Sequence, residues 1–171
     1  MEVGGPMAIQ EAWAGRYFED FKQGDIYRAP VGRTVSETDN TWFTLLTNNP
    51  NQIHFNAEYA SRTEFGRPLV NSTLTLAIVT GMTVADVSQN GFALGYEEVT
   101  MPRPVFAGDT LYAETEVVEV RESRSRPEQG IVTTRTRGLN QRGDVVLQMR
   151  RQVMVWRRDA APRVDSFPLS P

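Results

Sequence analysis

Residues 65–74 read Phe-Gly-Arg-Pro-Leu-Val-Asn-Ser-Thr-Leu, a glycine-proline turn that opens into a long apolar stretch. Between Pro68 and Gly81, small and apolar side chains recur on related faces of a helix: Leu69, Val70, Thr73, Leu74, Ala77 and Ile78. A helix of this composition suits a position that is buried on most sides. We therefore expect a long, central helix that begins at Pro68.

The chain changes character after the Gln89-Asn90-Gly91 turn. Runs rich in β-branched and aromatic residues, partly alternating, are separated by proline, glycine and aspartate turns. Such runs predict strands, which we place over residues 92–101, 110–120, 130–140 and 145–156. Helices followed by at least four antiparallel strands predict an α+β fold with the long helix packed on one sheet.

The segment before the central helix predicts a lead-in strand and two shorter helices. Residues 17–33 have strand character, broken by Gly24-Asp25 and Pro30. Ser36 can cap a helix, supported by Asp39 three residues later. This helix ends at Asn48-Asn49-Pro50, because proline disfavours a helical residue before it, and a second short helix is expected over 57–62. The buried face of the first helix is expected to hold the large apolar residues that recur at helical spacing: Trp42, Phe43, Leu45 and Leu46.

The length of 171 residues suits one domain. We place it at residues 15–158. Residues 1–14 are small and polar and are expected to be disordered, and the proline-rich residues 159–171 are expected to form a loose tail.

Composition excludes several kinds of site and partner. The chain has no cysteine and one histidine, which excludes thiol nucleophiles, zinc–thiolate sites and His-rich metal sites. We expect no metal and no cofactor. The net charge of −3 argues against nucleic acid as a partner. No apolar run reaches the roughly 18–20 residues that span a bilayer, and no signal peptide is evident, so we expect a cytoplasmic protein without a membrane partner.

His54 is the only histidine in the chain, and it follows the polar run Thr47-Asn48-Asn49-Pro50-Asn51-Gln52-Ile53. Histidine is the side chain that ordinarily titrates near neutral pH. His54 is therefore the first candidate for proton transfer. Asn48, Asn49 and Asn51 are also residues that favour turns, and they can serve that purpose alone.

Three ordered motifs carry a family resemblance. The run from Thr47 to His54, the run Phe65-Gly66-Arg67-Pro68-Leu69-Val70-Asn71-Ser72, and the later Pro104-Val105-Phe106-Ala107-Gly108-Asp109-Thr110-Leu111 resemble motifs of MaoC-like (R)-specific enoyl-CoA hydratases. The resemblance covers about residues 16–157. It implies the hot-dog fold, in which an antiparallel sheet wraps a long central helix. Residues 64–72 and 86–90 are similar to the branch that includes mesaconyl-CoA hydratases, also called β-methylmalyl-CoA dehydratases.

The resemblance implies roles for individual residues. Hydration of an unsaturated thioester needs a base that activates water, an acid that protonates Cα and donors that stabilise an enolate-like oxyanion. His54 maps to the catalytic histidine of the family. Ser72 stands where the family has glycine at the start of the central helix, so its N–H is the expected oxyanion donor. Asn71, beside it, and Thr80, two turns on, are expected to line the site.

Asn49 is the main departure from the family pattern, because it occupies the position of the catalytic aspartate. An amide is neither an acid nor a base at neutral pH. Either Asn49 orients the water while His54 transfers the proton, or another carboxylate substitutes. Glu64, Glu97 and Glu98 are the candidates for that substitution.

Three arginines are candidates for binding negative charge. Arg67 lies beside the expected site and could pair with a substrate carboxylate. Arg124 and Arg126 could contact the phosphates of coenzyme A, although a solvated strand end is the simpler interpretation of their run.

The sequence thus predicts reversible hydration of a short enoyl-CoA. A branched dicarboxylic substrate such as mesaconyl-CoA is one candidate. A non-catalytic acyl-binding protein is the alternative that Asn49 leaves open. A hot-dog thioesterase is disfavoured because no acidic residue lies between Pro68 and Met82. Members of this family usually pair through their sheets, so a homodimer or larger homo-oligomer is expected, which would also protect exposed sheet edges.

Overall fold

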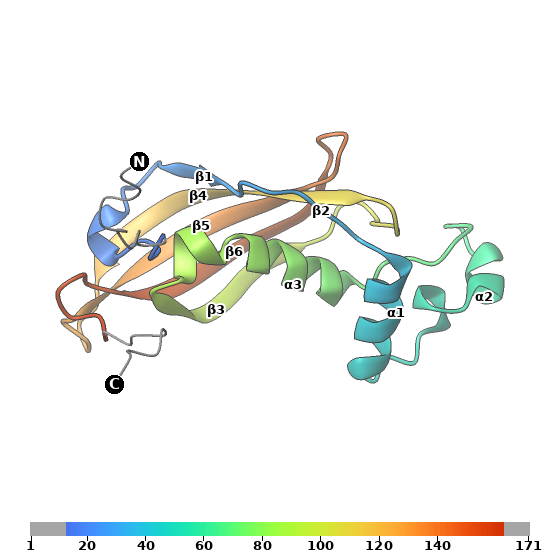
Figure 1. Cartoon of the computed structure of the whole chain (residues 1–171), viewed down its shortest axis with the longest axis horizontal. Helices are drawn as coiled ribbons and strands as arrows, with labels where there is room; N and C mark the ends of the chain where they lie inside the picture. Colours follow the sequence, from blue (N-terminus) through green and yellow to red (C-terminus); the bar gives the residue numbers. More distant parts are fainter. Residues whose placement is uncertain (1–12, 163–171) are drawn as a thin grey trace, which may run out of the picture.

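The computed structural model describes residues 13–162. One antiparallel sheet and one central helix dominate it (Figure 1). The strands follow the spatial order β1-β4-β5-β6-β3, and β2 pairs with β4 off this path. Their bounds are β1 Ile26–Arg28, β2 Arg33–Thr34, β3 Gly91–Thr100, β4 Thr110–Glu122, β5 Gln129–Leu139 and β6 Val145–Trp156. The four long strands lie within two residues of the predicted ranges, and the α+β prediction is confirmed.

The helical elements precede the long strands. They are a 3-10 helix at Phe18–Asp20, α1 Glu37–Leu46, a 3-10 helix at Gln52–His54, α2 Ala57–Ser61, α3 Ser72–Met82 and a π-helix at Val84–Ser88. In Figure 1, α1 and α2 lie together at one end of the molecule, and α3 runs from them across one face of the sheet. None of the helices within residues 13–162 has the length and apolarity needed to cross a bilayer.

Helix α3 packs closely on the sheet because β5 offers a glycine beneath it. A Cβ atom at Gly138 would lie 2.7 Å from Val79 Cγ2 of α3. Gly138 pairs with Leu147 of β6, and Leu147 is fully buried. The side chains of α3 that are buried there join one cluster with the inner faces of β4 and β6: Leu74, Val79, Leu111, Ala113, Val146, Leu147 and Met149.

A second apolar cluster fills the other end of the sheet, beneath the N-terminal 3-10 helix and the π-helix. Its buried members are Phe18, Phe21, Val87, Val117, Val132, Val153 and Val155. The two clusters together cover the inner face of the sheet along its length, which is the arrangement of the hot-dog fold.

The start of the central helix was predicted four residues too early. Leu69 forms a β-bridge with Phe106, and Val70 N–H donates to Val105 O at 2.9 Å. These contacts hold 69–70 in extended conformation, and the Asn71 side chain then caps α3 by accepting from Thr73 N. Helical periodicity could not reveal this later start, because apolar residues such as Leu69 and Val70 occur in both helical and extended segments.

The predicted buried face of α1 is wrong. Trp42, Leu45 and Leu46 have exposed fractions of 69%, 55% and 77%. The fully buried side chains of α1 are instead the polar Asn40 and Thr44. Phe43 does pack against the core, but only partly buried. Helix α1 therefore turns a polar strip inward and an apolar strip outward.

The predicted start of α1 is confirmed in detail. Ser36 caps the helix and forms a capping box with Asp39. The carboxylate of Asp39 also accepts two hydrogen bonds from the Arg33 guanidinium, at 2.8 and 3.0 Å. The hydrogen bonds from Arg33, and to a lesser degree the one from the Ser36 backbone N–H, hold the pKa of Asp39 well below its usual range. This anchors α1 to β2.

We expect the substitution Asp39→Asn to destabilise the fold in a pH-dependent way. A carboxyl group with a lowered pKa in the folded state stabilises the fold above its ordinary pKa, and this contribution is lost as the pH falls through the lowered value. The destabilisation should therefore be larger at about pH 7 than at about pH 2, as measured by urea unfolding. A difference in unfolding free energy that is the same at both pH values would contradict this.

The predicted tails fall mostly on residues 1–12 and 163–171, which lie outside the described residues. Trp13, which is described, donates its indole N–H to Ala85 O at 3.1 Å, and Ala14 O accepts from Asn90 Nδ2 at 2.8 Å.

Candidate active site

His54 ends the 3-10 helix Gln52–His54 and is 9% exposed. Its Nδ1 lies 2.8 Å from the carbonyl oxygen of Leu69. Because a carbonyl oxygen can only accept, Nδ1 carries the proton in this arrangement, and Nε2 is the basic nitrogen of the neutral ring. The geometry thus selects the tautomer in which Nε2 can receive a proton.

Asparagines shape the backbone around His54. Asn48 adopts a left-handed conformation with φ 53°, two residues after the end of α1. Asn51 caps the 3-10 helix by accepting from Ile53 N at 3.2 Å, and Asn56 caps α2 by accepting from Tyr59 N at 3.0 Å. The run of asparagines therefore builds the turns that hold His54 between α1 and α2.

A cavity of about 220 Å³ opens beside His54. It is lined by Glu37, Asn40, Thr41, His54, Phe55, Ala57, Arg67, Pro68 and Ala107. Three of these residues come from α1, where positions i, i+3 and i+4 share one face. His54 therefore faces a cavity that combines an imidazole, a carboxylate, an amide, a hydroxyl and a guanidinium.

Arg67 is one of the residues that line this cavity. Its Cζ atom sits 4.1 Å from the centroid of the Phe106 ring. Stacking of this kind holds a guanidinium in place while its N–H groups stay available to an anion. Gly66 allows the turn before it, since it adopts φ +68°.

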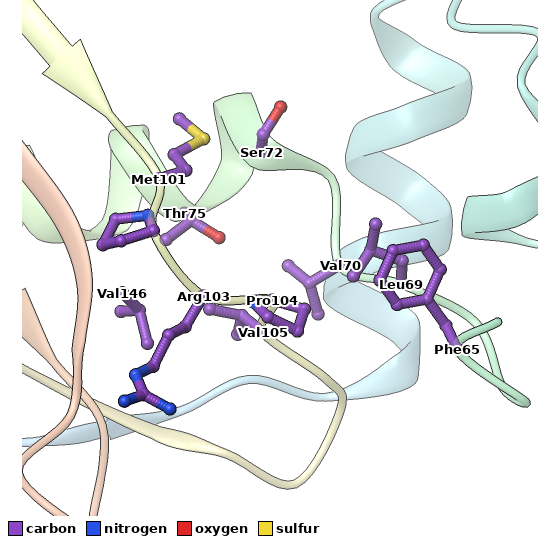
Figure 2. A pocket seen from close by; sticks show the side chains of 11 residues that line it. Phe65, Leu69, Val70, Ser72, Thr75, Met101, Arg103, Pro104, Val105 and Val146 are labelled. Atoms are coloured by element: carbon purple, nitrogen blue, oxygen red, sulfur yellow. The ribbon is translucent and has the colours of Figure 1, made fainter.

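A second cavity of about 240 Å³ lies at the N-terminal end of α3 (Figure 2). Ser72 and Thr75 enter it from α3, and Leu69 and Val70 from the segment before the helix. Its other lining residues are Phe65, Met101, Pro102, Arg103, Pro104, Val105 and Val146. Ser72 N–H belongs to the first turn of α3, whose N–H groups have no partner within the helix. Thr75 was missed by sequence analysis, although its spacing from Ser72 places it on the same face.

The two cavities adjoin along residues 68–70 and have no lining residue in common. Pro68 lines the His54 cavity, whereas Leu69 and Val70 line the Ser72 cavity. The side chain of Leu69 thus faces one cavity, while its carbonyl oxygen fixes the imidazole of the other. The structure places Arg67 and His54 in one cavity and Ser72 in the other.

Asn49 has a turn-forming position in this structure. Its Oδ1 accepts from Asn51 N at 3.0 Å, and its N–H donates to Thr44 O at 3.0 Å. It lines neither of the two cavities. A role in orienting water stays a prediction that these contacts do not support.

Two further residues predicted to line the site do not do so. Asn71 is 2% exposed and its amide is used internally: Oδ1 accepts from Thr73, and Nδ2 donates to Thr44 Oγ1 at 3.2 Å. The Thr80 hydroxyl faces Met149 Sδ on the sheet, at 3.8 Å. Both expectations came from the family resemblance, which gives positions along the chain but not the face that meets the cavity.

Arg124 and Arg126 lie far from both cavities, and their contact with the phosphates of coenzyme A stays a prediction. They lie in the turn between β4 and β5, whereas the Leu69–Phe106 bridge lies just before the other end of β4. The 13 residues of β4 separate these ends by about 40 Å at about 3.3 Å per residue. Arg126 instead lies over the Phe92 ring, at 5.7 Å.

The carboxylates proposed as substitutes for the family aspartate lie elsewhere. Glu97 pairs with Arg150 at 3.0 Å on the edge of the sheet, and Glu98 is exposed beside it. Glu64 lines neither cavity. Among the described residues, the acidic side chain that lines the His54 cavity is Glu37, which sequence analysis missed. Its spacing from Asn40 and Thr41 was the available signal.

Comparison with known proteins identifies the family of the chain. Residues 8–165 match the family model of mesaconyl-CoA hydratase. The chain is 40% identical over 149 residues to the mesaconyl-CoA hydratase of Cereibacter sphaeroides, covering 86% of this chain and 43% of that protein. It therefore spans less than half the length of this curated relative.

Two solved structures agree with this result. A MaoC domain dehydratase structure from Chloroflexus aurantiacus superposes with a TM-score of 0.83 at 29% identity, covering 95% of this chain and 46% of that one. The MaoC-like dehydratase from Rhodospirillum rubrum gives a TM-score of 0.75 at 31% identity, covering 84% of this chain and 98% of that one. The chain belongs to the mesaconyl-CoA hydratase family, within the MaoC-like hot-dog hydratases.

Proposed function

We propose that this chain adds water reversibly to the carbon–carbon double bond of a short α,β-unsaturated acyl-CoA. The single observation that carries the proposal is the hydrogen bond from His54 Nδ1 to Leu69 O, which leaves Nε2 as a base at a cavity. The names of the family's relatives support the reaction class.

The steps follow from what each group can do. His54 Nε2 accepts a proton from water as the water oxygen bonds to Cβ, and the electron pair of the double bond moves toward the thioester carbonyl. The protonated ring of His54 then gives this proton to Cα, which completes the addition and leaves the imidazole neutral again. A substrate that uses both cavities has its thioester where they adjoin, at Leu69. There the Ser72 N–H, at the positive end of α3, would stabilise the oxyanion.

A short acyl chain suits the His54 cavity, which holds both the base and Arg67, and whose volume of about 220 Å³ leaves little room for a long one. A branched dicarboxylic acyl group such as the mesaconyl group would in addition need a cation. Arg67, which is stacked on the Phe106 ring and lines the His54 cavity, is the residue we propose for it.

The substitution Arg67→Gln tests this assignment. We expect it to lower kcat/KM for mesaconyl-CoA about 10- to 100-fold relative to crotonyl-CoA, because one charge-assisted hydrogen bond is lost only with the dicarboxylic substrate. Arg62→Gln is the matched control, since Arg62 pairs with Glu58 on α2 outside either cavity. An equal loss with both substrates would remove Arg67 from substrate selection.

A non-catalytic acyl-binding protein is the second candidate, and the turn-bound amide of Asn49 favours it. The two functions are separated by comparing turnover of crotonyl-CoA, followed as loss of the enoyl-thioester absorbance, with calorimetric binding of butyryl-CoA, the saturated analogue. Turnover establishes the hydratase. Binding of butyryl-CoA without any turnover of crotonyl-CoA or mesaconyl-CoA would establish the binding protein.

We also propose that the chain pairs with a second copy. The apolar strip Trp42, Leu45 and Leu46 on α1 is exposed, and the edge strand β3 exposes Phe92, Leu94 and Tyr96. Exposed apolar surface and an unpaired edge of this kind mark contact surfaces. Light scattering should give the mass of a dimer or larger assembly, and Leu46→Glu should lower it. A monomeric mass for the unaltered chain would contradict the proposal. The cytoplasmic location stays a prediction.

A further inference from the structure

Asn40 is a buried amide on the inner side of α1, with an exposed fraction of 3%. Its side chain makes three hydrogen bonds to backbone groups 14 to 31 residues away. Nδ2 donates to His54 O at 2.7 Å and to Leu69 O at 3.0 Å, and Oδ1 accepts from Asn71 N at 2.8 Å. One side chain thus joins α1, the His54 turn and the N-terminus of α3.

The carbonyl oxygen of Leu69 is the centre of this network. It accepts from His54 Nδ1 at 2.8 Å and from Asn40 Nδ2 at 3.0 Å. A carbonyl oxygen has two lone pairs, so both are used. Asn40 therefore fixes the acceptor that decides which nitrogen of His54 carries the proton.

The Asn40 amide also bonds to the backbone beside the two groups proposed for the reaction. It donates to the carbonyl oxygen of His54 itself, and it accepts from the N–H of Asn71, one residue before Ser72. The relative placement of the base and of the first turn of α3 depends on these two bonds. This accounts for the polar inner strip of α1, where Thr44 Oγ1 likewise accepts from Asn71 Nδ2 at 3.2 Å.

We propose that Asn40 is a positioning residue that sets the tautomer and placement of His54 relative to α3. Its effect on turnover rests on the proposed hydratase function, whereas its effect on the imidazole does not. The position requires two donors and one acceptor in one short planar group, and asparagine supplies them. Aspartate has the same shape but no donor, and its carboxylate would face two carbonyl oxygens.

The experiment compares Asn40→Asp with Thr44→Val. Both side chains are buried on the same face of α1, but the Thr44 hydroxyl bonds to the side-chain amide of Asn71, whereas Asn40 bonds to the backbone of His54, Leu69 and Asn71. Because His54 is the only histidine, the nitrogen-15 shifts of a single imidazole report its tautomer directly. Asn40→Asp should add a population protonated on Nε2 and lower kcat for crotonyl-CoA about 10- to 100-fold, as displacement of a catalytic group does. Its KM should change little.

Thr44→Val should lower the free energy of unfolding but leave the imidazole shifts and kcat close to those of the unaltered chain. Should Asn40→Asp not fold, Asn40→Ser, which keeps one donor, is judged by the same shifts. A folded Asn40 variant with unaltered imidazole shifts and kcat would overturn the proposal. If the unaltered chain hydrates neither crotonyl-CoA nor mesaconyl-CoA, the hydratase assignment fails, and the imidazole shifts still decide the role of Asn40.

Discussion

The substitution His54→Ala is expected to lower the rate of enoyl-CoA hydration about 100- to 10,000-fold, the contribution usual for a positioned acid or base. His54 is the only histidine of the chain, so no second imidazole can take its place. The measurement is kcat/KM for crotonyl-CoA, followed by loss of the enoyl-thioester absorbance.

The control for this variant separates loss of chemistry from loss of structure. The hydrogen bond to Leu69 O disappears with the imidazole, so the circular dichroism and the unfolding midpoint of His54→Ala must be compared with those of the unaltered chain. Partial recovery of the rate on adding free imidazole would support the assignment further. A folded variant that keeps its rate within a few-fold would exclude His54 as the base.

The second large effect is expected at Leu147, where the central helix meets the sheet. Leu147 is fully buried opposite Gly138, and both lie beneath Val79 of α3. Replacing it by alanine leaves a cavity. Helix α3 cannot easily move into this cavity, because it already lies against Gly138. We expect Leu147→Ala to lower the free energy of unfolding by about 2–5 kcal/mol, as measured by urea denaturation.

Ile26→Ala is the matched control on the edge strand β1. Ile26 has an exposed fraction of 57%, and a surface substitution usually changes the unfolding free energy by less than about 0.5 kcal/mol. Equal losses for the two variants would show that the interface between α3 and the sheet contributes no more to stability than the exposed edge.

The strands and the helix caps were predictable because they depend on local patterns. Alternating β-branched residues between turn signals located β3 to β6, and Ser36 with Asp39 located the start of α1. These features need only the neighbouring residues. The start of α3 was missed because the extended conformation of Leu69 depends on Phe106, which lies 37 residues away in the chain.

Helix α1 shows why its orientation was not predictable. Its apolar residues recur at helical spacing, so they were expected to face the core, yet Trp42, Leu45 and Leu46 are exposed. The inner face is chosen by Asn40 and Thr44, whose partners His54, Leu69 and Asn71 are distant in sequence. Hydrogen bonds between distant segments leave no periodic signal.

The residues of the site that depend on local motifs were predictable, and those that depend on contacts between distant segments were not. His54 and Arg67 were found because each sits in a motif that resembles a known family. Asn40, Glu37 and Thr75 belong to no such motif, and only the assembled fold brings them to the cavities. Conversely, Asn71 caps the predicted helix and Thr80 lies on it, but their side chains face the protein interior.

The most direct test of the central claim is a reaction of the unaltered chain with mesaconyl-CoA and crotonyl-CoA in water labelled with heavy oxygen, with the products analysed by mass spectrometry. Hydration by His54 predicts a hydroxyacyl-CoA that carries the label on Cβ, with the thioester intact, and predicts that His54→Ala forms almost none. Release of free coenzyme A with the label in the carboxylate would instead identify a thioesterase. Either that result or the absence of any labelled product from both substrates would contradict the assignment.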